Sequence, residues 1–160
     1  MKAITLWQPW ASLIATGAKT FETRSWKTTY RGPLVICSAK GGLSKSELIH
    51  HLCFSSISEG LASIRKKPAD PSRPYSVLSL YDLPKGYALC VVNVVDCKKT
   101  DDLTQGEIGT DKPVGDFSLG RYAWKLDLLY VFAEPFPVKG QQGFFNVDIP
   151  AGAVPEGIIK

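Results

Sequence analysis

The strand-like segments of this chain are not separated by regular helices, and this order restricts the fold more than any other sequence feature. The strongest segment is 87–96, because β-branched valines fill its centre and favour an extended backbone. A doubly wound parallel sheet would need a helix between successive strands. We therefore predict an α+β fold, a partly closed mixed β-barrel of about six strands with two or three flanking helices. The other expected strands are 3–6, 19–26, 33–37, 121–132, 136–138 and 144–147.

Proline and glycine mark the first expected helix. Pro9 suits the first helical position, where its missing N–H would have no partner, and Gly17 suits the end. The predicted helix therefore runs from Pro9 to about Thr16. The strand at 33–37 is an unbroken apolar run, which is typical of a strand buried on both faces.

The middle of the chain has a different character. Ser44-Lys45-Ser46-Glu47 matches a capping box and predicts a helix over 44–54, with another short helix at 61–67. Residues 68–86 contain four prolines, which remove backbone donors and predict a long surface loop. Since 160 residues is the size of one domain, we expect a single domain over 1–160 with a helical and proline-rich insertion at about 41–86.

Composition excludes several classes of protein. With 44% hydrophobic residues and a net charge of +4, the chain is globular and slightly favours anionic partners. Its four cysteines form no Cys-x-x-Cys pair, so we expect buried thiols, no metal and no cofactor. His50 and His51 are too few ligands for zinc, and we expect them to be solvated on a helix. We see no signal peptide and no membrane span, and expect an intracellular protein, cytoplasmic or, in a eukaryote, nuclear.

The densest cluster of unusual residues lies between Gln8 and Lys40. Free N–H groups at the start of the first helix, beside Gln8, would form an anion site. Lys19 follows the Gly17 turn, and the strand after it has period-two character. Glu22, Arg24 and Trp26 therefore share one strand face, where Glu22 and Arg24 can form an ion pair.

Aromatic and basic residues elsewhere could complete a nucleic-acid surface, because bases stack on aromatic rings and cations follow phosphates. For each tryptophan the alternative is a place in the core, which we expect for Trp7 in particular. For each isolated cation the alternative is an ordinary solvated side chain. The candidates are Trp10, Trp26 and Trp124 for stacking, and Lys40, Arg121 and Lys139 for charge.

The segment from Gly17 to Arg24, Gly-Ala-Lys-Thr-Phe-Glu-Thr-Arg, resembles the Gly-x-Lys-x-x-Glu-x-Arg signature of ASCH (activating signal cointegrator homology) domains at every signature position. Flanking residues 8–13, 24–26 and 30–32 are also similar to that family. The resemblance is strong over 3–40, weaker over 87–148 and absent from 41–86. It implies a PUA-like β-barrel with a cleft, lined by Lys19, Glu22 and Arg24, that accepts nucleic acid.

We therefore predict a module that binds nucleic acid, RNA rather than DNA, or a nucleotide-like ligand. One alternative is a hydrolase of RNA or of a modified nucleoside (a ribonuclease or an acylcytidine amidohydrolase), with Lys19 as base or nucleophile and Glu22 as proton relay. The acylcytidine hydrolases resemble this chain but carry threonine in place of Glu22, and their separate catalytic glutamate has no match here. Another alternative, implied by the family's founding member, is a protein-interaction module of a transcription-related complex.

Overall fold

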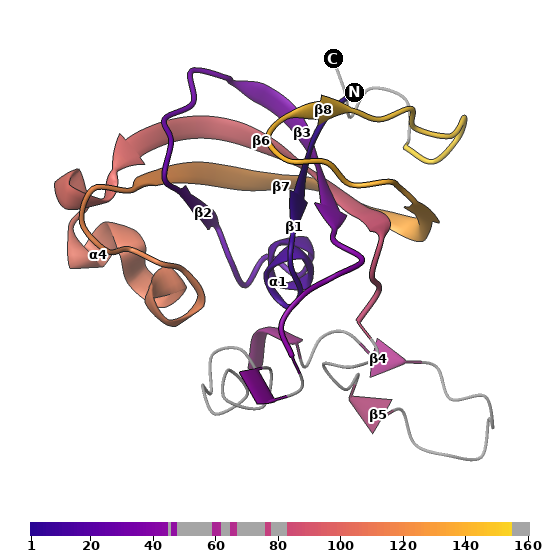
Figure 1. The fold of residues 1–160 in the computed structure, drawn as a ribbon, viewed down its shortest axis with the longest axis horizontal. Coiled ribbons are helices and arrows are strands. Elements are labelled where there is room, and N and C mark those ends of the chain that lie inside the picture. The colour runs from indigo at the N-terminus through magenta and orange to yellow at the C-terminus, as the bar shows by residue number, and fades with distance from the viewer. Residues whose placement is uncertain (45, 48–58, 62–64, 67–75, 78–82, 155–160) are drawn as a thin grey trace.

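The computed structural model describes residues 1–44, 46–47, 59–61, 65–66, 76–77 and 83–154 of the 160-residue chain. Its main feature is a mixed six-stranded sheet in the order β2-β7-β6-β3-β1-β8 (Figure 1). β1 and β3 are parallel, and the other neighbouring strands are antiparallel. The predicted α+β class and strand count are confirmed. The strands are β1 (Lys2–Leu6), β2 (Phe21–Arg24), β3 (Gly32–Ser38), β6 (Tyr87–Lys99), β7 (Tyr122–Pro137) and β8 (Phe145–Asn146).

The helices beside this sheet are short. α1 (Trp10–Ala15) begins one residue after the predicted start and is followed by Gly17, whose φ of 77° suits glycine. Between β6 and β7 the chain forms helical segments that the sequence analysis missed. Their available signal was a capping box at the start of α4, in which Thr104 and Glu107 bond each other's backbone N–H groups. These segments are the 3₁₀ helix η2 (Thr100–Asp102), α4 (Gln105–Ile108) and the 3₁₀ helix η3 (Gly109–Val114).

The second half of the sheet corrects the predicted strand boundaries. Residues 121–132 and 136–138 were expected as two strands, but they belong to the single strand β7. Shifts of register between β6 and β7 at three places allow the pairing to continue over this length. Alternation in the sequence does not reveal such bulges.

The region between β3 and β6 also differs from the prediction. A second small sheet pairs β4 (Arg65–Lys66) with β5 (Ser76–Val77), so the helix expected at 61–67 is wrong at its end and the loop expected at 68–86 contains a strand. The predicted capping box is confirmed, because Ser44 and Glu47 exchange hydrogen bonds. The rest of the helix expected over 44–54, with His50 and His51, lies outside the described residues.

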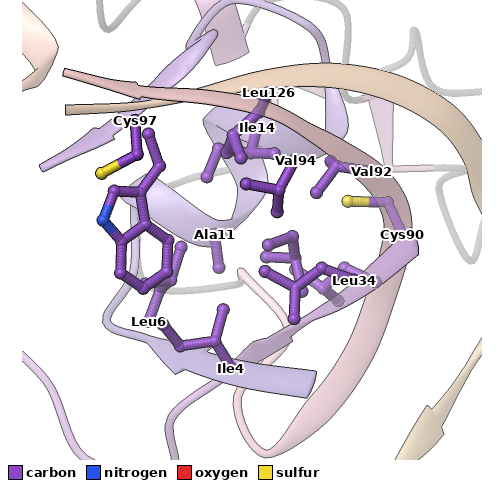
Figure 2. Close-up of a cluster of buried hydrophobic side chains, with 13 residues drawn as sticks. Ile4, Leu6, Ala11, Ile14, Leu34, Cys90, Val92, Val94, Cys97 and Leu126 are labelled. Carbon is purple, nitrogen blue, oxygen red and sulfur yellow. The ribbon is translucent and has the colours of Figure 1, made fainter. Parts of the chain in front are cut away.

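The main core lies inside the curve of the sheet, where α1 packs against it. Figure 2 shows its side chains pointing toward one another from β1, α1, β3, β6 and β7. Leu34 and Ile36 of β3 face this core, while Val35 and Cys37 face a second cluster on the other side. This alternation confirms that the strand at 33–37 is buried on both faces. Three cysteines, Cys37, Cys90 and Cys97, are buried free thiols, as expected.

Candidate nucleic-acid interface

An open cleft of about 1190 Å³ lies beside the end of β1. Seven segments line it: the end of β1 with Trp7, the start of α1, residues around β2, residues 39–40 after β3, residues 113–116 at the end of η3, Arg121 before β7, and the β7–β8 loop (139–143). β1 and β2 are separated by three strands in the sheet order, yet both line this cleft. The sheet is therefore curved enough to bring its ends to one concave surface.

Lys19, Glu22 and Arg24 converge on the cleft. Nζ of Lys19 lies 3.8 Å from Oε2 of Glu22, and Nε of Arg24 lies 3.0 Å from Oε1 of the same carboxylate. The predicted ion pair between Glu22 and Arg24 is thus present. Arg24 also donates a hydrogen bond from Nη2 to the carbonyl oxygen of Thr5, at 3.3 Å. The guanidinium therefore ties β2 to β1 across the cleft.

The ammonium of Lys19 is unusually desolvated, with 1% of its side chain exposed. Burial lowers its pKa below the usual value of 10.5, and the Arg24 guanidinium lowers it further. The carboxylates of Glu22 and Asp111 act in the opposite direction, but desolvation is the larger effect. Lys19 therefore releases its proton more readily than a solvated lysine does.

Asp111, which the sequence analysis missed, fixes the start of β2. Its Oδ1 accepts hydrogen bonds from the N–H groups of Thr20 at 2.8 Å and Phe21 at 3.0 Å, and its Oδ2 accepts one from Oγ1 of Thr20 at 2.8 Å. Asp111 belongs to η3, some ninety residues away in the sequence, so no local pattern could reveal this contact. The carboxylate positions the strand that carries Glu22 and Arg24.

The three outlying cations expected at the surface all line the cleft. Lys40 and Lys139 are exposed, whereas Arg121 is held by Oδ2 of Asp116 at 3.2 Å and by the carbonyl oxygen of Thr23 at 3.2 Å. With Lys19 and Arg24, the lining contains five cationic side chains against two carboxylates, those of Glu22 and Asp116. The cleft therefore has a positive formal charge and can hold an anion.

The tryptophans do not all lie where the sequence suggested. Trp124, a stacking candidate, is 0% exposed, with its ring centroid 4.6 Å from that of Trp26 and 5.4 Å from that of Phe144. Trp7, expected in the core, is 54% exposed and lines the cleft, so that expectation is wrong. Trp10 and Trp26 line the cleft and are partly buried. The exposed ring available to a base is that of Trp7.

Gln8 has a structural role instead of the expected contact with a ligand. It is 2% exposed, donates a hydrogen bond from Nε2 to the carbonyl oxygen of Pro84 at 2.8 Å, and accepts one at Oε1 from the N–H of Ser12 at 3.1 Å. The N–H of Ala11 donates to the carbonyl oxygen of Trp7. The N–H groups of Ala11 and Ser12, two of the three donors expected to bind an anion at the start of the helix, therefore already have partners.

Two further features are absent from the part of the chain that the structure describes. No group of three histidine, cysteine or acidic side chains is placed there to hold a metal ion. No helix in the same residues has the length and apolar character needed to cross a membrane.

Two comparisons relate this chain to known proteins. The chain is 26% identical over 146 residues to activating signal cointegrator 1 of Mus musculus. That alignment covers 91% of this chain but 22% of the relative, so the chain spans about a fifth of the relative's length. The sequence profile of the ASCH domain matches residues 4–135, which include Lys19, Glu22, Arg24 and most of the cleft. The chain therefore belongs to the ASCH domain family.

Proposed function

We propose that the cleft binds a single strand of nucleic acid, RNA in preference to DNA, and that this binding is the function of the chain. The observation that supports the proposal best is the meeting of five cationic side chains with one exposed indole in a single open cleft. Cations neutralise phosphates, and an exposed aromatic ring stacks on an unpaired base for roughly 1–3 kcal/mol. Membership of the ASCH family supports the same function by analogy.

Each group has a place in this proposal. Lys40 and Lys139 are exposed and contact phosphates, while Trp7 stacks on a base. Lys19 and Arg24 form the floor, where Glu22 holds both cations in position. Trp10 and Trp26 present their exposed edges to the ligand, and Trp124 supports them from the core.

The architecture is part of the proposal. We interpret the curved sheet as a PUA-like, partly closed barrel whose open side is spanned by the Arg24 side chain rather than by backbone pairing. Residues 1–160 then form one domain with an insertion at about 41–86. Contacts at the two ends of that insertion support this interpretation, since Leu43, Leu61 and Leu83 join a hydrophobic cluster with Leu13 of α1.

Fluorescence anisotropy with a labelled single-stranded RNA and the DNA of the same sequence tests the proposal. The affinity should fall steeply as salt increases, and should fall after Lys19→Ala, Arg24→Ala or Trp7→Leu. Lys99→Ala is the control, because Lys99 is exposed, does not line the cleft and carries the same charge. Absence of binding at low salt would refute the proposal, and binding that does not depend on salt would favour the third reading, a protein-interaction module.

A second candidate function is hydrolysis of RNA or of an acylated nucleoside. The observation that favours it is a buried lysine with a lowered pKa, 3.8 Å from a carboxylate, at the wall of an open cleft. Incubation with acetylated cytidine and with labelled RNA would reveal turnover that Lys19→Ala abolishes. The engagement of Glu22 by two cations favours binding over hydrolysis, because a carboxylate that holds Lys19 and Arg24 in place already has a structural role.

A further inference from the structure

Among the described segments that line the cleft, the β7–β8 loop (139–143) supplies the amide side chains. All five of its residues line the cleft and are exposed. They are Lys139, two glycines, and the glutamines Gln141 and Gln142. Neither amide makes a hydrogen bond to another residue in the described ranges. Both are therefore available to a ligand.

The loop is fixed at both ends and in its middle. Before it, the N–H of Val138 donates to the carbonyl oxygen of Gly86 at 2.8 Å. After it, the ring of Phe144 packs 5.3 Å from Trp26, centroid to centroid. Between them, Gly140 lies against Thr5 of β1 so closely that an added Cβ would be 2.6 Å from Oγ1 and 2.9 Å from Cγ2. The loop thus forms a wall of defined position.

This wall stands beside the exposed indole. Gly140 contacts Thr5, Trp7 is two residues beyond Thr5, and Gln141 directly follows Gly140. The backbones of Trp7 and Gln141 therefore each lie within about 10 Å of that contact. A base stacked on Trp7 would therefore lie near these amides in the same cleft.

We propose that Gln141 and Gln142 read the edge of a base bound in the cleft and select adenine. The inference rests on the proposed function. An amide presents a donor and an acceptor side by side, which matches the N6 donor and N7 acceptor of adenine. On the same edge guanine presents two acceptors, N7 and O6, which pair with an arginine or lysine donor and repel the amide oxygen, and the exposed lysines of the cleft are assigned to phosphates. Both arginines of the cleft are already engaged, Arg24 by Glu22 and Arg121 by Asp116.

The test compares four labelled RNA octamers, uridine throughout except for A, C, G or U at the fifth position. The wild-type chain should bind the adenine octamer at least fivefold more tightly than the others, the lower end of the discrimination expected of one bidentate contact. The double variant Gln141→Leu/Gln142→Leu should lose this preference and bind the four octamers with affinities within twofold of one another. Gln105→Leu is the control, because Gln105 lies outside the cleft and pairs with Lys112.

Different failures have different meanings. Equal affinity for the four octamers, or a preference that survives the double variant, would overturn this inference and leave the proposed function intact. Absence of salt-dependent binding to every octamer would overturn both.

A second experiment tests whether the position of the loop matters, with substitutions that change neither a charged side chain nor the two glutamines. Gly140→Ala should weaken the adenine preference at least threefold, because its Cβ would overlap Thr5 and displace the loop. Adding Thr5→Ala removes Oγ1 and Cγ2 and should restore the preference. Gly41→Ala, where an added Cβ meets no atom within 4 Å, should change nothing. A Gly140→Ala variant with unaltered preference would contradict the role of the loop.

Discussion

At the scale of single residues, Lys19 shows how burial and charge compete within the cleft. Its neighbours include two carboxylates that favour the ammonium form, from Glu22 and Asp111. Burial nevertheless lowers its pKa, because removing an ammonium from water costs more free energy than Glu22, at 3.8 Å, and Asp111 together restore. A ligand phosphate entering the cleft would add a further negative charge and favour the protonated form.

Replacement of Lys19 by methionine should remove a pH dependence of stability. The pKa of Lys19 is lowered in the folded chain, so the unfolded chain binds more protons between that lowered value and 10.5. The free energy of unfolding of the wild type should therefore rise with pH across this window, relative to Lys19→Met. Urea unfolding of both proteins between pH 8 and 10.5 measures the difference. Burial raises the pKa of Cys37 to about 12, but this opposing effect is present in both proteins and cancels.

Replacement of Glu22 by glutamine should destabilise the fold, although the two side chains have the same shape. Lys19 and Arg24 would then share the floor of the cleft without the carboxylate that lies between them. The free energy of unfolding should fall by about 3 kcal/mol, the lower end of the range for breaking a buried ion pair. Glu134→Gln, at an exposed position of β7, is the control in the same denaturation experiment. A loss equal to that of the control would show that the two cations do not need the carboxylate.

At the scale of secondary-structure elements, β2 depends on a contact from outside the sheet. The strand pairs with β7 along one edge. At its start, the N–H groups of Thr20 and Phe21 donate to Asp111 of η3, which is distant in the sequence. Three hydrogen bonds thus converge on one buried carboxylate. A short helical segment that packs beside the cleft therefore controls the position of the signature residues.

Replacement of Asp111 by alanine should weaken both stability and binding. Two backbone N–H groups, those of Thr20 and Phe21, would lose their acceptor, and a buried donor without a partner costs about 1–3 kcal/mol. Thermal unfolding should show a marked decrease in Tm, and RNA affinity should fall with it. Asp111→Asn keeps one oxygen for these donors and should lose less. Asp127→Ala, an exposed carboxylate on β7, should have little effect.

The sequence predicts those elements whose signal is local. The β-branched centre of β6 and the apolar run of β3 identify strands without knowledge of their neighbours. The length of β7 depends on bulges against β6, and the pairing of β4 with β5 depends on residues far apart in the chain. Neither can be derived from periodicity.

The candidate site was predictable to a similar degree. Period two placed Glu22 and Arg24 on one face, and the family signature added Lys19. Trp7 was expected in the core and is exposed, whereas Trp124, a stacking candidate with the core as its alternative, is buried, because exposure depends on what covers each ring. Trp124 is covered by Trp26 and Phe144, whereas Trp7 projects beyond the end of β1. Composition carries no information about such coverage.

At the scale of the whole molecule, the distribution of charge matters more than its total. A net charge of +4 over 160 residues is small, and would attract an anion weakly if it were spread evenly. The cleft instead contains five cationic side chains and two carboxylates, an excess of three positive charges. A concave surface with this excess concentrates the field where a strand would enter, so association should be fast at low salt.

This concentration of charge can be measured through counterion release. For single strands, the logarithm of the binding constant falls against the logarithm of salt concentration with a slope of about −0.7 for each phosphate neutralised. Lys40→Ala/Lys139→Ala should therefore reduce the magnitude of the slope by about 1.4 if each lysine contacts one phosphate. Lys27→Ala/Lys99→Ala removes the same two charges from outside the cleft, and should leave the slope unchanged. Equal effects from the two double variants would mean that net charge attracts the strand; a smaller slope only after Lys40→Ala/Lys139→Ala would locate its path between these two lysines.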